Sequence, residues 1–247
     1  MIVLGVILLV IGFLTGIAVL WSIGALLLVV GLILWVLGSV GPGTKLPSLG
    51  HAPYAVLRDA YQQQVAGLVA GGADAILIES AQDLLQAKAA IVGAKRALAD
   101  AGVPLPVFAQ VTVETTGTML LGSDIAAVVN ALRPFPIASL GLNCATGPTE
   151  MAEHIAYLSK HWDRAFSVIP NAGLPILVDG RPEYPLRPDA FGAAMRRYLE
   201  DYGAGIVGGC CGTTTDHIRA LREVVGTRSP VTRAAVRTPG CSSLYGF

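Results

Sequence analysis

The residues with the clearest chemistry are two adjacent cysteines, Cys210 and Cys211, within the stretch GGCCGT at 208–213. A disulfide between neighbouring cysteines is strained, and the flanking glycines permit backbone angles that aim both sulfurs at one point. A short apolar run precedes the pair, and Thr214 or Thr215 after it is typical of a helix N-cap. The pair therefore lies on a strand-to-helix turn, at the rim where α/β folds carry out chemistry.

Two soft ligands at one point suggest zinc, which takes about four ligands. Cys144 ends another predicted strand, and Asn171 ends the strand between Cys144 and the cysteine pair. Because strand ends in a barrel point at a common centre, the three sulfurs can converge and Asn171 can fill a fourth position weakly. The alternatives are an ordinary buried thiol for Cys144 and a redox pair for Cys210 and Cys211. Three cysteines at strand ends favour a metal site.

Two carboxylates, Glu79 and Glu114, also follow predicted strands. Either can bind a substrate ammonium group, and an acid/base pair is a further alternative. We favour Glu79 for substrate binding, since it follows a wholly apolar run, and a solvated position for Glu114. The four histidines are expected at the surface or at helix caps, because a metal-binding histidine needs convergent partners: His51, His154, His161 and His217.

Five apolar runs, each followed by a predicted helix, are the elements that position these residues. The strands are expected at 75–78, 107–113, 138–142, 166–169 and 204–207. Strands that are apolar on both faces are typical of parallel sheets covered by helices. Polar residues recur at their carboxyl ends, which favours an α/β fold with a partial (β/α)8 barrel of the TIM type. An open doubly wound sheet is the second choice, weakened because no GxGxxG follows the first strand.

A closed barrel needs eight strands, and the pattern supplies five. Residues 34–37 can add a sixth, which would end at the glycine-rich turn over 38–43. That turn is equally consistent with a substrate cradle and a linker. The other two strands have no candidate except the apolar block at the N-terminus.

Residues 1–44 contain no charged side chain, and Lys45 is the first. We expect residues 2–37 to form a helical hairpin in a membrane, turning near Trp21-Ser22, with the barrel on the cytoplasmic side. The alternative is a pair of buried elements in a globular core. The expected domains are the hairpin at 1–37, the barrel at 38–226 and a linker-like tail at 227–247. A formal net charge of zero argues against a nucleic-acid partner.

Several stretches taken together resemble the homocysteine S-methyltransferase family, most closely the homocysteine-binding module of cobalamin-dependent methionine synthases. They run in family order: GSVGPGTKLPSLGH at 38–51, GGADAILIES at 71–80, VTVETTGTMLLGSD at 111–124, GLNCATGP at 141–148, PNAGLP at 170–175 and GGCCGTT at 208–214. The resemblance implies a (β/α)8 barrel with zinc on the cysteines matching Cys144, Cys210 and Cys211. It also implies that Asn171 is a zinc ligand when substrate is absent and that Glu79 helps to bind the homocysteine amino group.

The implied reaction is methyl transfer from methylcobalamin to the homocysteine thiolate, which gives methionine. No cobalamin-binding module is visible, so the cofactor is expected on a separate domain or chain. Ser243-Leu244-Tyr245 resembles the start of the link to a folate-binding module.

The chain departs from the family in two places. The DGAMGT-like motif of the first strands, whose aspartate also binds homocysteine, is replaced by the apolar block. Thr215 stands where the family usually has proline. These departures keep two alternatives open: a non-catalytic zinc-binding barrel remnant anchored to the membrane, and a dithiol redox protein.

Overall fold

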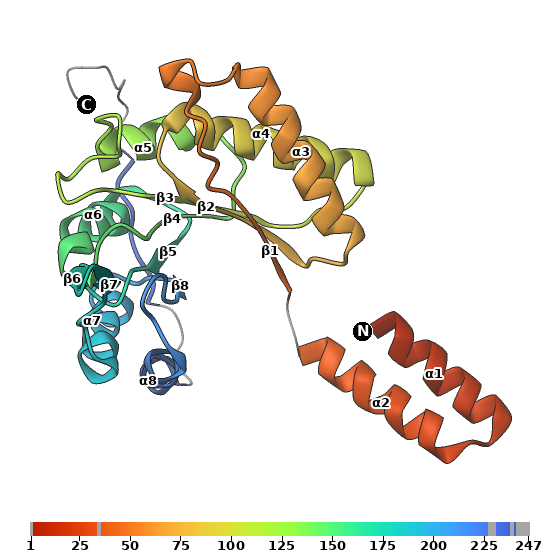
Figure 1. The fold of residues 1–247 in the computed structure, drawn as a ribbon. Coiled ribbons are helices and arrows are strands. Elements are labelled where there is room, and N and C mark those ends of the chain that lie inside the picture. The colour runs from red at the N-terminus through yellow and green to blue at the C-terminus, as the bar shows by residue number, and fades with distance from the viewer. Residues whose placement is uncertain (1, 34–35, 227–230, 238–239, 241–247) are drawn as a thin grey trace.

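The computed structural model describes residues 2–33, 36–226, 231–237 and 240. Its centre is a curled, six-stranded parallel sheet with the order β1-β2-β3-β4-β5-β8 (Figure 1). Because the strands follow the order of the chain without reversal, the sheet is wound like a barrel and not like a doubly wound fold. The strands are β1 (Leu37–Val40), β2 (Ala75–Ala81), β3 (Val107–Val111), β4 (Ser139–Asn143), β5 (Ala165–Ile169) and β8 (Ile206–Val207).

Helices cover the convex side of this half-barrel (Figure 1). They are α3 (Tyr54–Ala70), α4 (Leu84–Ala101), α5 (Ile125–Leu132), α6 (Pro148–His161), α7 (Pro188–Glu200) and α8 (Thr215–Val225), with a short 3₁₀ turn, η1 (Pro47–Leu49), before α3. Between β5 and α7 the chain forms an antiparallel hairpin of β6 (Ile176–Val178) and β7 (Arg181–Glu183). The predicted strand–helix units are therefore present, and β1 adds a sixth strand.

The core lies between the sheet and the helices, because alternate strand residues point toward the helical layer. These side chains are at most 2 % exposed and include Ile76, Ile78, Leu140, Leu142, Phe166 and Val168. The opposite face carries half-buried apolar residues such as Leu77 and Phe108 together with small and polar ones. There Gln110 Nε2 donates to Ser167 Oγ over 2.9 Å, and a Cβ at Gly141 would lie 1.9 Å from the same oxygen. A glycine at 141 therefore leaves room for this buried polar pair.

Two boundaries differ from those expected from the sequence. The sixth strand is β1 at Leu37–Val40, which uses part of the predicted glycine-rich turn, while residues 34–35 of the expected strand lie outside the described chain. The sequence also predicts a helix over residues 81–101, and the structure begins this helix, α4, at Leu84. The reason is Asp83, whose side chain accepts a hydrogen bond from Leu85 N over 2.8 Å and so caps the helix.

The apolar N-terminal block forms two helices, α1 (Ile2–Thr15) and α2 (Ala18–Ile33). The chain turns at Gly16, whose φ of 72° ends α1, and not at the predicted Trp21-Ser22. Glycines let the two helices touch: a Cβ at Gly12 would lie 2.4 Å from Trp21 N. Figure 1 shows this pair projecting away from the half-barrel.

The prediction that residues 2–37 form a membrane anchor is wrong. Helices α1 and α2 contain 14 and 16 residues, and no helix in the described part of the chain has both the length and the apolar character to cross a bilayer. At a rise of about 1.5 Å per residue, each is shorter than the roughly 30 Å hydrocarbon layer. The predicted membrane-associated location falls with the anchor.

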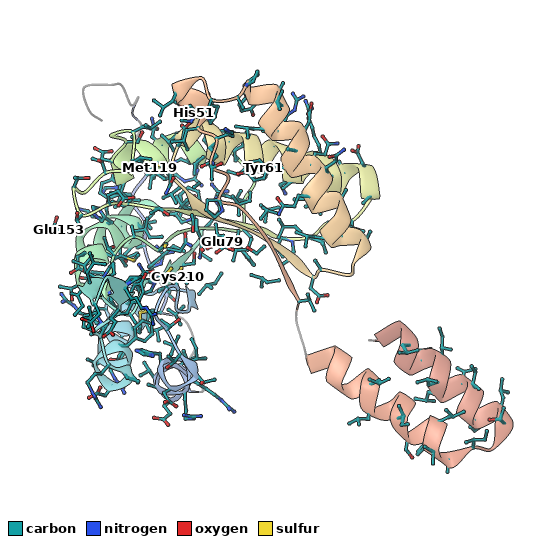
Figure 2. All side chains as sticks on the ribbon, in the orientation of Figure 1. His51, Tyr61, Glu79, Met119, Glu153 and Cys210 are labelled. Carbon is teal, nitrogen blue, oxygen red and sulfur yellow. The ribbon has the colours of Figure 1, made fainter. Side chains whose placement is uncertain are left out.

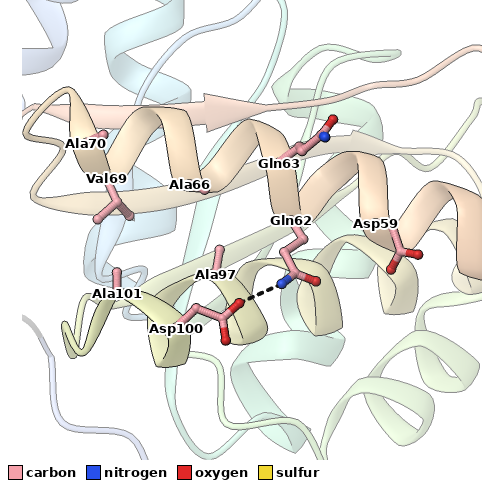
Figure 3. A pocket seen from close by; sticks show the side chains of 9 residues that line it. All are labelled: Asp59, Gln62, Gln63, Ala66, Val69, Ala70, Ala97, Asp100 and Ala101. Carbon is pink, nitrogen blue, oxygen red and sulfur yellow. Dashed lines mark hydrogen bonds between the residues drawn. The ribbon is translucent and has the colours of Figure 1, made fainter.

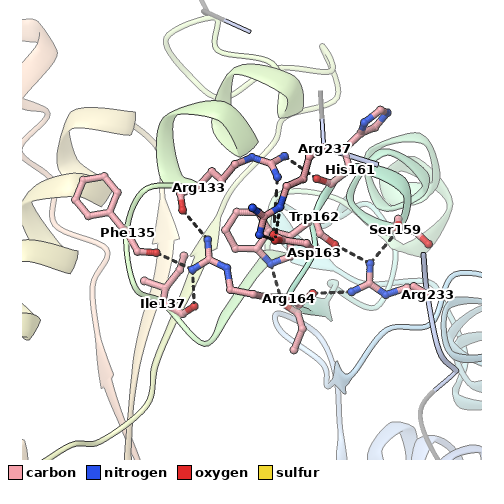
Figure 4. Close-up of polar contacts among 11 residues, drawn as sticks. Arg133, Phe135, Ile137, Ser159, His161, Trp162, Asp163, Arg164, Arg233 and Arg237 are labelled. Atoms are coloured by element: carbon pink, nitrogen blue, oxygen red, sulfur yellow. Dashed lines mark hydrogen bonds and ion pairs between the residues drawn. The ribbon is translucent and has the colours of Figure 1, made fainter. Parts of the chain in front are cut away.

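The segment 231–237 lies against the half-barrel and is held there by arginine (Figure 4). Arg233 donates to the carbonyl oxygens of Ser159, Trp162 and Arg164 at 2.9, 3.0 and 2.6 Å, and its guanidinium lies 4.6 Å from the centre of the Phe166 ring. This part of the predicted tail therefore packs on the barrel.

Candidate metal centre

Three sulfur atoms meet at the carboxyl ends of two strands. Cys144 directly follows β4, and Cys210 and Cys211 lie just beyond β8. Their sulfurs all lie within 4.8 Å of one another; the Cys144–Cys211 separation is 3.7 Å and the Cys210–Cys211 separation is 3.9 Å. Sulfurs bound tetrahedrally to zinc at about 2.3 Å are roughly 3.8 Å apart. The three thiols therefore fit a single zinc ion.

An unusual backbone conformation accompanies the position of Cys144 in the sulfur cluster. Cys144 and Ala145 have φ angles of 61° and 56°, a left-handed conformation that costs free energy in residues other than glycine. Hydrogen bonds hold the turn: Cys144 N donates to Ile169 O over 3.2 Å, and Thr146 N donates to Cys144 O over 2.7 Å. One of the residues that supplies a sulfur is therefore held in a strained backbone conformation.

The cysteine pair is fixed by its neighbours in the same way. Cys210 N donates to Pro170 O over 2.8 Å, and the hydroxyl of Thr213 donates to Cys210 O over 2.6 Å. These contacts tie the loop after β8 to the end of β5 and to its own helix. Both cysteines therefore have a defined backbone position before any metal binds.

Asn171 links the two halves of the sulfur cluster. Its side-chain oxygen accepts a hydrogen bond from Cys211 N over 3.0 Å, and its side chain lies close enough to the Cys144 thiol to help lower the pKa of that thiol. Asn171 is only 3 % exposed. The structure places this residue between two of the predicted metal ligands.

Glu79 is connected to the cluster through β4. Ser39 Oγ donates to the Glu79 carboxylate. The next residue, Ser80, donates from its backbone N to Asn143 Oδ1 over 2.8 Å, and Asn143 Nδ2 donates to Ser80 Oγ over 2.8 Å. Since Asn143 directly precedes Cys144, these bonds set the position of Glu79 relative to the sulfurs. Figure 2 shows Glu79 and Cys210 along the curved sheet.

The three thiols do not hold their protons equally. Hydrogen bonding, chiefly from the Cys210 thiol, lowers the pKa of Cys144 to about 5. The pKa of Cys210 is raised, chiefly because its proton is engaged with the Cys144 sulfur, and burial raises the pKa of Cys211. The metal-free cluster at neutral pH is therefore one thiolate, at Cys144, supported by two protonated neighbours.

The histidines and Glu114, which were expected outside the metal site, lie apart from the group of three sulfurs. Within the described residues, the three cysteines are the one group of metal-ligating side chains with convergent atoms, and it includes no histidine. His217 caps α8: its Nδ1 accepts from Thr214 N over 3.1 Å. Glu114 lies half-buried in the loop after β3.

One neighbour of the cluster was missed from the sequence. Tyr184 follows the β6–β7 hairpin, and its ring packs against Gly212, the residue after Cys211. The available signal was the dipeptide Asp179-Gly180, which is typical of a two-residue hairpin turn. Recognising that hairpin would have placed a tyrosine close to the strand ends.

A cleft of about 580 Å³ lies elsewhere, in the helical layer between α3 and α4. Figure 3 shows its lining, with Gln62 Nε2 donating to Asp100 Oδ2 over 2.7 Å. None of the predicted site residues lines it. The predicted site residues therefore lie away from this cleft.

A barrel-type α/β fold with three convergent thiols at its strand ends has the geometry of a metal-binding barrel protein. The comparisons with known proteins are more specific. The sequence model of the homocysteine S-methyltransferase family matches residues 23–225. The chain therefore belongs to this family.

Two curated relatives are methionine synthases of Mycobacterium tuberculosis strain H37Rv and Mycobacterium leprae. They are 54 % and 53 % identical over 211 and 216 residues. Each match covers 85 % of this chain and 18 % of the relative, so the chain spans less than a fifth of their length.

Solved structures of the homocysteine methyltransferase MmuM from Escherichia coli, in apo and metallated forms, share the fold. Their TM-scores are 0.61 and 0.58 at 21 % identity. The matches cover 83 % of this chain and 69 % and 67 % of those chains.

Proposed function

We propose that residues 38–226 form a zinc-dependent homocysteine S-methyltransferase domain, which transfers a methyl group to the homocysteine thiolate to give methionine. The observation that carries this proposal is the convergence of the Cys144, Cys210 and Cys211 sulfurs within 4.8 Å, in a chain of this family. Three protein ligands leave a fourth position for an incoming sulfur, the arrangement of catalytic zinc sites.

Each residue near the cluster has a proposed task. The three cysteines hold the zinc, which when bound supplies the positive charge that keeps a substrate thiol deprotonated at neutral pH. Asn171 closes the fourth position until homocysteine arrives, with its oxygen already oriented by Cys211 N at 3.0 Å. Glu79 receives the homocysteine ammonium group, and its carboxylate is oriented by the Ser39 hydroxyl.

The methyl donor is proposed to be methylcobalamin on a corrinoid-binding module of another domain or chain. This chain corresponds to less than a fifth of the methionine synthases that it matches, so a donor module and a folate-binding module fit in the remainder of such proteins. The open strand ends with the three thiols are the place where such a module would approach.

A second candidate is a zinc-binding remnant without methyl transfer. The described residues supply six parallel strands, whereas a closed barrel has eight. The two edge strands, β1 and β8, therefore lack the neighbours that closure would give them within the described chain. This reading predicts metal binding without homocysteine binding.

The test is to measure zinc content and then titrate homocysteine into the zinc-loaded protein by calorimetry. The methyltransferase proposal predicts about one zinc per chain and release of about one proton as the substrate thiol is deprotonated. Zinc binding with no response to homocysteine would support the remnant. Absence of zinc, with reversible oxidation of Cys210 and Cys211, would support a redox protein.

Matched variants make this test specific. Cys144→Ser removes one of the three sulfurs and should lower zinc affinity by more than the roughly 10–100-fold that loss of an outer hydrogen-bond partner costs. Cys241→Ser changes the fourth cysteine of the sequence and should leave zinc affinity unchanged. Equal zinc affinity in the two variants would contradict the proposed ligand set.

A further inference from the structure

The β6–β7 hairpin places Tyr184, the residue that follows it, beside the candidate metal centre. Asp179 and Gly180 have φ angles of 49° and 73°, the two positive values that a type I′ turn requires. The turn pairs Val178 with Arg181 and ends β7 at Glu183, directly before Tyr184. A two-residue turn of this kind fixes the register of the hairpin.

The segment after the hairpin is held from two sides, by the loop that carries Asn171 and by helix α8, which follows the cysteine loop. Leu186 N donates to Ala172 O over 3.0 Å, beside Asn171. From the other side, His217 Nε2 and Leu186 O are 2.8 Å apart. Because His217 Nδ1 accepts from Thr214 N, the ring proton is on Nε2, which donates to Leu186 O. Tyr184 is therefore anchored close to both Asn171 and the cysteine loop.

The tyrosine ring packs directly on the cysteine loop. A Cβ added at Gly212 would lie 2.2 Å from Tyr184 Cγ, so the ring occupies the space that any other residue at 212 would need. Gly212 also has a φ of 76°, which favours glycine. The Tyr184 side chain lies beside the adjacent Cys211 thiol, close enough for each group to affect the pKa of the other. The ring therefore lies against the loop that carries Cys211.

We propose that Tyr184 is a positioning residue of the metal centre, whose O–H donates to the Cys211 thiolate and holds that sulfur in the three-cysteine set. The proposal rests on the zinc site of the proposed function and adds a partner from outside the ligand loops. A hydrogen bond to an ionised sulfur stabilises its charged form, which is the form that binds metal. The same bond removes some electron density from Cys211, so Tyr184 adjusts how strongly this sulfur donates to the metal.

The first test is Tyr184→Phe, which keeps the ring on Gly212 and removes only the hydroxyl. We expect zinc affinity, measured by competition with a chelator, to fall about 10–100-fold, as for other outer-shell partners of metal ligands. The matched control is Tyr202→Phe, which removes a hydroxyl that accepts from Arg197 Nη2 over 3.2 Å on the surface of the barrel. That variant should bind zinc as the unmodified chain does.

Two further readouts separate positioning from a general structural role. In the metal-free protein, Tyr184→Phe should leave the thermal unfolding temperature close to that of Tyr202→Phe. With cobalt in place of zinc, loss of the hydrogen bond should move the thiolate-to-metal absorption band to longer wavelength, because the Cys211 sulfur becomes more electron-rich. The control should leave the band in place.

The outcomes distinguish this inference from the function on which it rests. If the unmodified chain binds no zinc, the proposed function fails first. If the unmodified chain binds about one zinc and Tyr184→Phe binds it equally well with an unshifted cobalt band, the Tyr184 proposal alone is overturned. A large loss of metal-free stability in Tyr184→Phe would also overturn it, since the residue would then act through folding.

Discussion

Cys144 differs from Cys210 and Cys211 in the state of its proton, and this difference has a measurable consequence. Its pKa is lowered to about 5, chiefly by the hydrogen bond with Cys210, whereas the pKa values of Cys210 and Cys211 are raised. At neutral pH Cys144 is therefore already a thiolate. Zinc binding must then displace protons from only two of the three sulfurs.

We predict release of about two protons per zinc at pH 7, rising to about three below pH 5, where Cys144 is protonated in the metal-free protein. Zinc affinity should accordingly fall about 100-fold for each pH unit lost near neutrality, since two protons compete with the metal. Calorimetry in buffers of different ionisation enthalpy measures both quantities. Release of three protons at pH 7 would show that Cys144 is not the thiolate.

The candidate site was largely predictable at the residue scale. Cys144, Asn171, Cys210 and Cys211 each follow an apolar run, and parallel strands bring such positions to one edge. Tyr184 was not found, because it is brought to the site by a hairpin inserted after β5 and not by a strand of the barrel. Residues that reach a site through an insertion leave no periodic signal in the sequence.

At the scale of the elements, Asp83 joins the start of α4 to the turn before α3. Its carboxylate accepts from Leu85 N at 2.8 Å, from Ser48 N at 2.9 Å and from Ser48 Oγ at 2.7 Å. We predict that Asp83→Ala lowers the free energy of unfolding by about 2–3 kcal/mol, because a helix cap and two further bonds are lost together.

The control for Asp83 is Asp124, which caps α5 by accepting from Ala127 N over 2.7 Å. Asp124→Ala removes this single cap bond and should cost about 1 kcal/mol. Urea denaturation of both variants gives the comparison. Equal losses would mean that the Ser48 contacts add nothing to stability.

Element types were predictable where the pattern was long, and boundaries were not. Helix α3, predicted over residues 53–69, and helix α8, predicted over residues 215–225, lie within about a residue of those positions. Pro53 precedes the first, Thr214 precedes the second, and a glycine ends each. Strand β1 was displaced, because its pairing with Ala75 to Ile78 of β2 sets its limits and the local sequence does not. The break at Gly16 likewise depends on one backbone angle that the uniform apolar run conceals.

At the scale of the whole molecule, the contact of segment 231–237 with the barrel depends on two arginines in different settings. Arg233 donates to three backbone carbonyls and stacks on Phe166. We predict that Arg233→Met lowers the free energy of unfolding by about 1.5–3 kcal/mol, because those carbonyls lose charged donors.

Arg237 provides the contrast, since its side chain is 73 % exposed and pairs with Asp163. Arg237→Met should change the free energy of unfolding by only about 0.2–1 kcal/mol, as expected for an exposed ion pair. Chemical denaturation followed by tryptophan fluorescence measures both variants. A larger loss in Arg237→Met than in Arg233→Met would contradict the assigned roles.

The membrane prediction failed at this same scale. Residues 2–37 were predicted to form a hairpin of two helices in a membrane, but the structure forms helices of 14 and 16 residues there, and strand β1 begins at Leu37. Composition sets how much apolar surface a segment has. It does not set the length of the elements into which the segment folds.

The most direct test of the whole account is X-ray absorption at the zinc edge, recorded on the zinc-loaded chain before and after addition of homocysteine. Three sulfur neighbours at about 2.3 Å are predicted without substrate, and four with it. Fewer than three sulfurs, or a count that homocysteine leaves unchanged, would contradict the proposal that Cys144, Cys210 and Cys211 hold a metal open to a substrate thiol.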